Sequence, residues 1–84
     1  GAGDSTKPSK LSISISAAGQ LQLDGKNVSE NEISDAAKQE FAKNPDVQAI
    51  ISADKDVSHG KVVSILDVVK SVGVKRFAIS IDKK

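Results

Sequence analysis

The fold is decided by residues 53–74, ADKDVSHGKVVSILDVVKSVGV. Apolar side chains in its second half recur at three- and four-residue spacing, which places them on one face of a helix. These residues are Val62, Ile65, Leu66, Val69 and Val72. A helix with one apolar face buries that face against another element. The stretch therefore predicts a helix that forms one layer of a two-layer domain.

Both ends of this helix carry capping signals. Ser58 can accept a hydrogen bond from a backbone N–H of the first turn, and Val57 and Val62 are placed for a hydrophobic staple. Gly73 suits the left-handed residue just past the last turn. Ala53 closes one apolar segment and Val74 opens another, so the helix is expected to connect two strands.

The chain before this stretch predicts a hairpin and a second helix. Residues 11–16 alternate apolar and serine side chains, and the alternation resumes at residues 21–23 after a turn. Residues 24–27 form a second expected turn, in which Gly25 supplies a positive φ angle. Ser29 and Glu32 have the spacing of a capping box, and Pro45 indicates that the helix ends near residue 44.

Two further strands complete the predicted order β-β-α-β-α-β. Residues 47–53 contain adjacent Ile50 and Ile51, which indicates a strand covered on both faces or placed centrally. Residues 74–81 alternate again. The prediction is an α+β two-layer sandwich with two helices on one face of a mixed four-stranded sheet. Right-handed crossovers would make the second, third and fourth strands parallel, with the first antiparallel to the second.

Length and composition limit the classes of function. The 84 residues suffice for one small domain, residues 10–84, preceded by residues 1–9, which are expected to be a disordered linker or cloning remnant. The net charge is +1 with both signs scattered, which argues against nucleic-acid binding. No apolar run approaches the roughly 20 residues that span a bilayer.

The loop before the second helix holds the strongest candidates for chemistry. Asp54, Asp56 and His59 follow a strand, where open α/β sheets often bind ligands, and could be metal ligands or an acid–base pair. The alternative is that both aspartates solvate a turn while Ser58 caps the helix, and general residue preferences favour it. No nucleophile elbow, Walker loop or dinucleotide fingerprint occurs. We expect no catalytic residue, no cofactor and no metal.

The same stretch resembles the periplasmic domain of the ExbD/TolR family. The likeness lies in Ala53-Asp54, Val57, Gly60 and Val62-Val63, continues to a glycine before the last strand, and extends upstream over the whole domain. It implies an inner-membrane subunit that couples proton-motive force to a TonB- or TolA-type transducer, as in the TonB-ExbB-ExbD and Tol-Pal systems. The family's proton-coupled aspartate lies in a transmembrane helix that these residues do not contain, so no residue here inherits that role.

The resemblance also implies partners for the domain. These are a second copy in a homodimer, an ExbB/TolQ-like membrane subunit, the transducer and, in TolR-like members, peptidoglycan. A partner strand could add to an exposed sheet edge, and the alternating segments near the chain ends are the candidate edges. Their residues are Leu11, Ser12, Ile13, Ser14 and Ile15 in one segment, and Arg76, Phe77, Ala78 and Ile79 in the other.

Several alternatives stay open at the level of the sequence. The edge could be merely solvated and protected by Lys75 and Arg76. The domain could be a stand-alone peptide- or cell-wall-binding module without energy coupling, or a small α/β domain that uses the Asp54 loop. The choice between ExbD-like and TolR-like, the oligomeric state and the transported substrate are also open.

Overall fold

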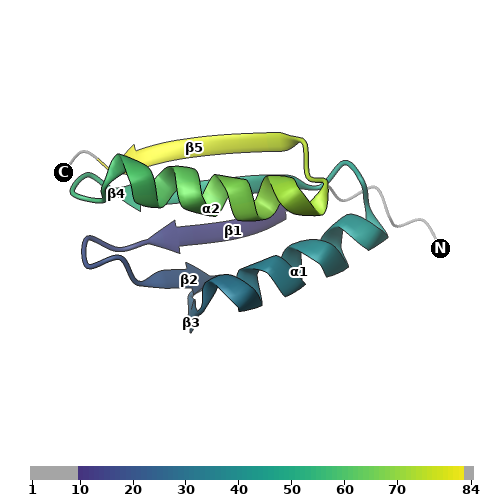
Figure 1. Cartoon of the computed structure of the whole chain (residues 1–84), viewed down its shortest axis with the longest axis horizontal. Coiled ribbons are helices and arrows are strands. Elements are labelled where there is room, and N and C mark those ends of the chain that lie inside the picture. The colour runs from purple at the N-terminus through teal and green to yellow at the C-terminus, as the bar shows by residue number, and fades with distance from the viewer. Residues whose placement is uncertain (1–9, 83–84) are drawn as a thin grey trace.

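The computed structural model describes residues 10–82, which form a sheet covered by two helices (Figure 1). The predicted linker, residues 1–9, lies outside the described residues. The elements in chain order are β1 (Lys10–Ile15), β2 (Leu21–Leu23), β3 (Lys26–Val28), α1 (Glu30–Lys43), β4 (Gln48–Asp54), α2 (His59–Val72) and β5 (Arg76–Asp82). Within residues 10–82, neither helix is both long and apolar enough to cross a membrane.

The sheet has five strands in the order β3-β2-β1-β4-β5. β4 lies parallel to both β1 and β5, whereas β2 lies antiparallel to β1 and β3. The predicted parallel partner of the third expected strand was therefore wrong, because it is the first segment, not residues 21–23. Length explains this choice: β1 pairs with β4 over residues 10–15, whereas β2 has only 3 residues to offer.

The extra strand arises from the turn that follows β2. Asp24 and Gly25 both have positive φ, 52° and 86°, and they join directly paired residues Leu23 and Lys26. Two positive φ angles in a two-residue loop define the tight hairpin turn that matches strand twist. The chain therefore reverses at once, and Lys26–Val28 joins the sheet. The predicted α+β class is confirmed, while the predicted strand count of four was wrong.

The helix boundaries follow the capping signals. The Ser29 N–H donates to Glu32 Oε1 over 2.8 Å, and Ser29 Oγ accepts from the Glu32 N–H over 3.2 Å, so the capping box is confirmed. At α2, Ser58 Oγ accepts from the Lys61 N–H over 3.1 Å. Gly73 ends this helix with φ of 119°. Each cap satisfies a backbone group that the helix cannot pair internally.

One core lies between the helices and a single face of the sheet. Ile33 of α1 and Ile65 of α2 join the same buried cluster as Ile13 and Ile51, which are direct neighbours on β1 and β4. Serines alternate with the buried residues of β1 and are exposed, so the other face of the sheet is open. The predicted arrangement of two helices on one face is confirmed, and β4 lies inside the sheet between β1 and β5. The full cluster is Leu11, Ile13, Ile15, Leu21, Ile33, Ala37, Val47, Ala49, Ile51, Ala53, Ile65, Val69 and Val74.

Candidate binding surfaces

The two segments predicted to form sheet edges have different positions in the fold. β5 pairs only with β4 and forms one edge of the sheet (Figure 1). β1 pairs with β2 on one side and β4 on the other, so the prediction that Leu11–Ile15 is an edge was wrong. β1 pairs with β4 over residues 10–15 and with β2 over residues 13–15, so it lies inside the sheet. The segment Arg76–Ile79 does lie at an edge, and its role in binding stays a prediction.

An apolar groove follows the β5 edge on the helix side of the sheet. Phe77, Ile79 and Ile81 lie in register with Ala49, Ile51 and Ala53, which are buried beneath the helices. Within residues 10–82, no strand or helix covers the outer part of β5, so Ile79 and Ile81 are each 47% exposed and Val63 of α2 is 39% exposed. The groove has a volume of about 330 Å³ and is lined by Val57, Val62, Val63, Leu66, Ile79 and Ile81, with Asp54, Lys55 and His59 at one end.

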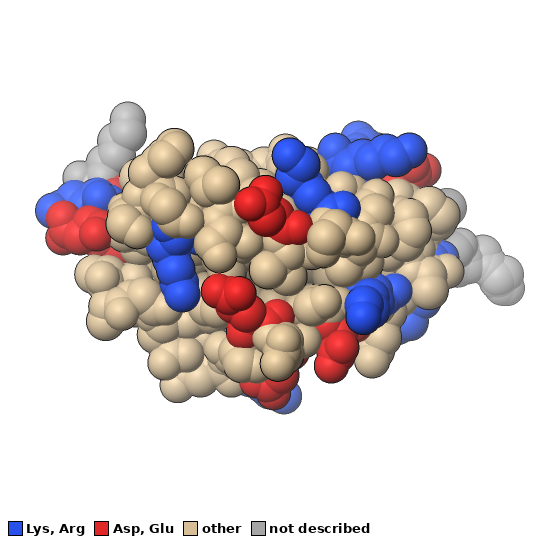
Figure 2. All heavy atoms as spheres, viewed as in Figure 1, with Lys and Arg blue, Asp and Glu red and all other residues tan. Residues whose placement is uncertain are grey.

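The charges on the helix side of the molecule do not favour the binding of a polyanion. Figure 2 shows Lys and Arg interspersed with Asp and Glu over the helix side, without a continuous basic patch on that face. Lys61 of α2 lies 3.9 Å from Glu30 of α1, which pairs one of these cations across the two helices. Mixed charge of this kind does not produce the concentrated positive field that nucleic-acid binding requires.

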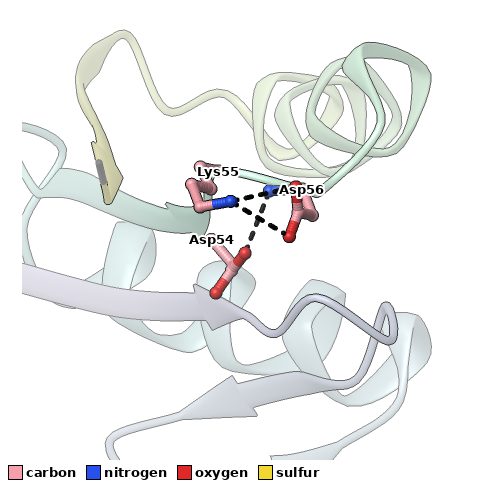
Figure 3. Close-up of polar contacts among 3 residues, drawn as sticks. All are labelled: Asp54, Lys55 and Asp56. Atoms are coloured by element: carbon pink, nitrogen blue, oxygen red, sulfur yellow. Dashed lines mark hydrogen bonds and ion pairs between the residues drawn. The ribbon is translucent and has the colours of Figure 1, made fainter. Parts of the chain in front are cut away.

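The Asp54 loop is organised by local hydrogen bonds (Figure 3). Asp54 Oδ1 accepts the Asp56 N–H over 2.9 Å, which is the side-chain-to-backbone bond of an Asx turn. Lys55 Nζ lies 3.4 Å from Asp56 Oδ1, and both side chains are largely exposed. Both carboxylates therefore make local contacts within the loop, as expected if the aspartates serve the turn.

The candidate ligands of this loop are not grouped as a metal site within residues 10–82. His59 is exposed at the start of α2. Among residues 10–82, no group of three or more His, Cys, Asp or Glu side chains is placed to hold a metal ion. Asp54, Asp56 and His59 are thus neighbours in the chain without converging on one point.

A polar depression on the open face of the sheet was not predicted as a site. Ser14, Ser52 and Ser80 lie side by side across β1, β4 and β5. The depression has a volume of about 570 Å³, and its polar lining consists of Ser14, Ser16, Gln22, Ser52, Asp54, Ser80 and Asp82. The alternation of serines in the sequence predicts that this face of the sheet is polar. Its concave shape depends on strand pairing, which the sequence pattern does not contain.

Together, these surfaces define a class: a small α+β domain that has an edge strand, β5, with an apolar groove beside it. Comparison with known proteins gives the family. Residues 2–84 match the family described as "Biopolymer transport protein ExbD/TolR", and the chain belongs to that family. The resemblance seen in the sequence is confirmed.

A curated relative agrees with this assignment. The chain is 28% identical over 79 residues to "Biopolymer transport protein exbD2" of Vibrio cholerae serotype O1. The match covers 94% of this chain and 59% of that protein, so the chain spans about three-fifths of the relative's length. The family description is one of transport.

Proposed function

We propose that this chain is the periplasmic domain of an inner-membrane ExbD/TolR-like subunit. The subunit would couple proton-motive force to a TonB- or TolA-type transducer and so serve outer-membrane transport or envelope integrity. The observation that carries the proposal is the family match over residues 2–84. An ExbB/TolQ-like subunit would be engaged through a membrane helix preceding residue 1, and the domain itself would act by binding.

The β5 edge is the proposed binding surface. In the described part of the chain no strand adjoins the outer side of β5, and an extended segment can pair with such an edge by main-chain hydrogen bonds. Ile79 and Ile81 would meet the apolar side chains of that segment in the groove beside α2. Either a segment of the transducer or a second copy of the domain could supply the strand.

A second candidate is a stand-alone module that binds peptides or the cell wall without energy coupling. The polar depression favours it, because serine hydroxyls and the amide of Gln22 can donate and accept hydrogen bonds with a polar polymer such as peptidoglycan. Co-sedimentation of the domain with purified sacculi tests this candidate. Binding that is abolished by Ser52→Leu, but not by the matched Ser71→Leu on α2, would support it.

The energy-coupling proposal is tested on the natural protein. An antibody against this domain would recover the protein from a membrane fraction, and its mass and N-terminal sequence would be measured. We expect a longer chain with one apolar helix that carries an aspartate before residue 1. A soluble chain of about 84 residues would contradict the proposal.

The binding surface is tested by an NMR titration of the labelled domain. The probe is a synthetic peptide from the periplasmic part of the transducer, with a scrambled peptide as the control. We expect the largest amide shifts in residues 76–82. If the amide signals of β5 did not shift, the proposal that the transducer binds this strand would be contradicted.

A further inference from the structure

We propose that the polar depression on the open face of the sheet binds the arginine side chain of a partner peptide. The guanidinium lies between the carboxylates of Asp54 and Asp82 and donates its remaining N–H groups to neighbouring serine hydroxyls. The site is on the opposite face of the sheet from the groove beside β5, so the inference goes beyond the proposed function and does not rest on it. It assigns the depression a different ligand from the polar polymer considered above.

The depression lies where three neighbouring parallel strands end. Its lining includes residues 14–16, 52–54 and 80–82, from the carboxyl ends of β1, β4 and β5. Ligands of open α/β sheets commonly bind at the carboxyl ends of the strands. Both helices lie on the other face of the sheet (Figure 1), so a side chain can enter the depression from the solvent.

Two carboxylates lie side by side in this depression. Asp54 and Asp82 are direct neighbours across β4 and β5, and adjacent strands are about 4.8 Å apart. Like charges in such positions are unfavourable, and a cation placed between them removes this cost. Asp54 Oδ1 accepts the Asp56 N–H over 2.9 Å, so a backbone hydrogen bond already holds one of the two carboxylates in place.

No basic side chain of residues 10–82 lines the depression. Lys55 follows Asp54 in the chain, but it lies 3.4 Å from Asp56 and lines the groove beside β5. The basic residues Lys10 and Arg76 belong to the row at the other end of the strands. Residues 76 and 82 are six positions apart on β5, which is about 20 Å along an extended strand. That separation is about twice the screening length at physiological ionic strength, so the depression attracts a cation.

The lining favours a guanidinium over a metal ion. Within the described residues no group of three or more His, Cys, Asp or Glu side chains could hold a metal. A guanidinium has five N–H donors in a planar fork and binds carboxylates through two parallel hydrogen bonds. The two carboxylates accept some of these donors, and the hydroxyls of Ser14, Ser52 and Ser80 in the adjacent row accept the others. An ammonium has only three donors and leaves more of these acceptors unused.

The rest of the lining suits the peptide on either side of the arginine. Gln22 Nε2 donates to Asn27 Oδ1 over 3.0 Å, which orients the side chain, and Gln22 Oε1 can accept a peptide N–H. Ser16 Oγ accepts the Gln20 N–H over 3.0 Å, and its hydroxyl can donate to a peptide C=O. The volume of about 570 Å³ leaves room for the adjoining backbone as well as the side chain.

An NMR titration of the labelled domain with matched peptides tests the charge of the ligand. The probe is an acetylated and amidated Gly-Ser-Arg-Ser-Gly peptide. Its control has citrulline in place of arginine, which keeps the shape and removes the charge. We expect amide shifts centred on residues 14–16, 52–56 and 80–82, and binding of the citrulline peptide that is at least about fivefold weaker. Equal binding of the two peptides, or no shift at tens of millimolar peptide, would overturn the proposal.

Charge-neutralising variants test the position of the site. Asp54→Asn and Asp82→Asn should each weaken binding of the arginine peptide at least about fivefold. Asp54→Asn keeps a side-chain oxygen that can accept the Asp56 N–H, so the loop is retained. Asp67→Asn, at an exposed position on α2, is the matched control and should bind within about twofold of the wild type. An unchanged Tm for each variant shows that the fold is kept. Losses as large for Asp67→Asn would overturn the site, because attraction would then depend only on net charge.

A neutral sugar separates this ligand from the polar polymer. Chitotriose has hydroxyl and amide groups but no charge, and it should bind the depression more weakly than the arginine peptide. Tighter binding of chitotriose that survives Asp54→Asn and Asp82→Asn would overturn the proposal in favour of a saccharide. The peptide titration of β5 and the membrane-fraction result concern other parts of the protein, so each can succeed or fail independently of this site.

Discussion

Gly73→Ala should destabilise the domain strongly, because two separate effects act at this residue. Gly73 ends α2 with φ of 119°, a conformation that residues with a Cβ rarely adopt. A Cβ added here would also lie 2.9 Å from Cζ of Phe41 and 3.1 Å from its Cε2. Phe41 belongs to α1 and packs against the core. The close approach of Gly73 and Phe41 therefore joins the end of α2 to α1.

The expected magnitude is the sum of the two effects. Forcing an L-residue into the left-handed region costs about 1–2 kcal/mol. Displacing a packed side chain to make room for a methyl group costs about 1–3 kcal/mol. The free energy of unfolding should therefore fall by about 2–5 kcal/mol. In a domain of this size each kcal/mol lowers the Tm by about 4–8 °C, so we expect a fall of at least about 8 °C.

Other glycines of the chain separate the two effects. Gly19 has φ of 88° with no atom within 4 Å of an added Cβ, so Gly19→Ala carries strain alone. Gly60 lies in α2 with neither a positive φ nor a close atom. Gly60→Ala should therefore stabilise the helix by about 0.5–1 kcal/mol. Urea unfolding followed by far-ultraviolet circular dichroism measures all three variants.

The order of the three results decides the argument. We expect Gly73→Ala to be less stable than Gly19→Ala, and Gly60→Ala to be more stable than the wild type. If Gly73→Ala lost no more stability than Gly19→Ala, the contact with Phe41 would carry no energy and the reasoning would be refuted. Adding Phe41→Leu to Gly73→Ala should recover part of the loss through relief of the close contact.

Further predictions concern the helix caps, the core and the Asp54 loop. Ser29→Ala removes the hydroxyl from the capping box and should lower stability by about 1 kcal/mol in urea unfolding. Ile51 is fully buried on the interior strand β4, so Ile51→Val should cost about 0.5–1.5 kcal/mol and Ile51→Ala about 2–5 kcal/mol, measured in the same way. Millimolar Ca²⁺, Mg²⁺ or Zn²⁺ should leave the Tm unchanged, because Asp54 and Asp56 make local bonds. A rise of several degrees would restore the metal-binding alternative.

Local signals in the sequence predicted the helices well, because caps act over a few residues. Ser29 and Glu32 lie at the first turn of α1. Ser58 directly precedes the first turn of α2, and Gly73 directly follows its last turn. Strand pairing is different, because hydrogen bonds between strands connect residues far apart in the chain. The pattern of residues 21–23 gave no sign that β1 rather than β2 would adjoin β4. The Asp24-Gly25 pair did carry the signature of a two-residue hairpin, but Lys26–Val28 lacks the alternation that marks a strand.

Alternation also could not separate an interior strand from an edge. The pattern reports which side of a strand is apolar, and both β1 and β5 direct their apolar side toward the helices. Only the assembled sheet distinguishes them. Leu11, Ile13 and Ile15 are almost fully buried, whereas Ile79 and Ile81 remain half exposed at the edge. The same alternation therefore led to an edge being predicted for both segments, although residues 11–15 lie inside the sheet and residues 76–79 lie at its edge.

The exposed edge is difficult to explain as a surface that is merely solvated. Proteins protect edge strands with charged side chains, prolines or bulges along the strand. In β5 the charges lie only at the ends, on Arg76 and Asp82, and residues 77–81 between them carry none. Lys75 and Arg76 thus protect one end and leave the apolar centre open. Ile79 lies at that centre and is 47% exposed, so the apolar surface of this edge is not protected by charge.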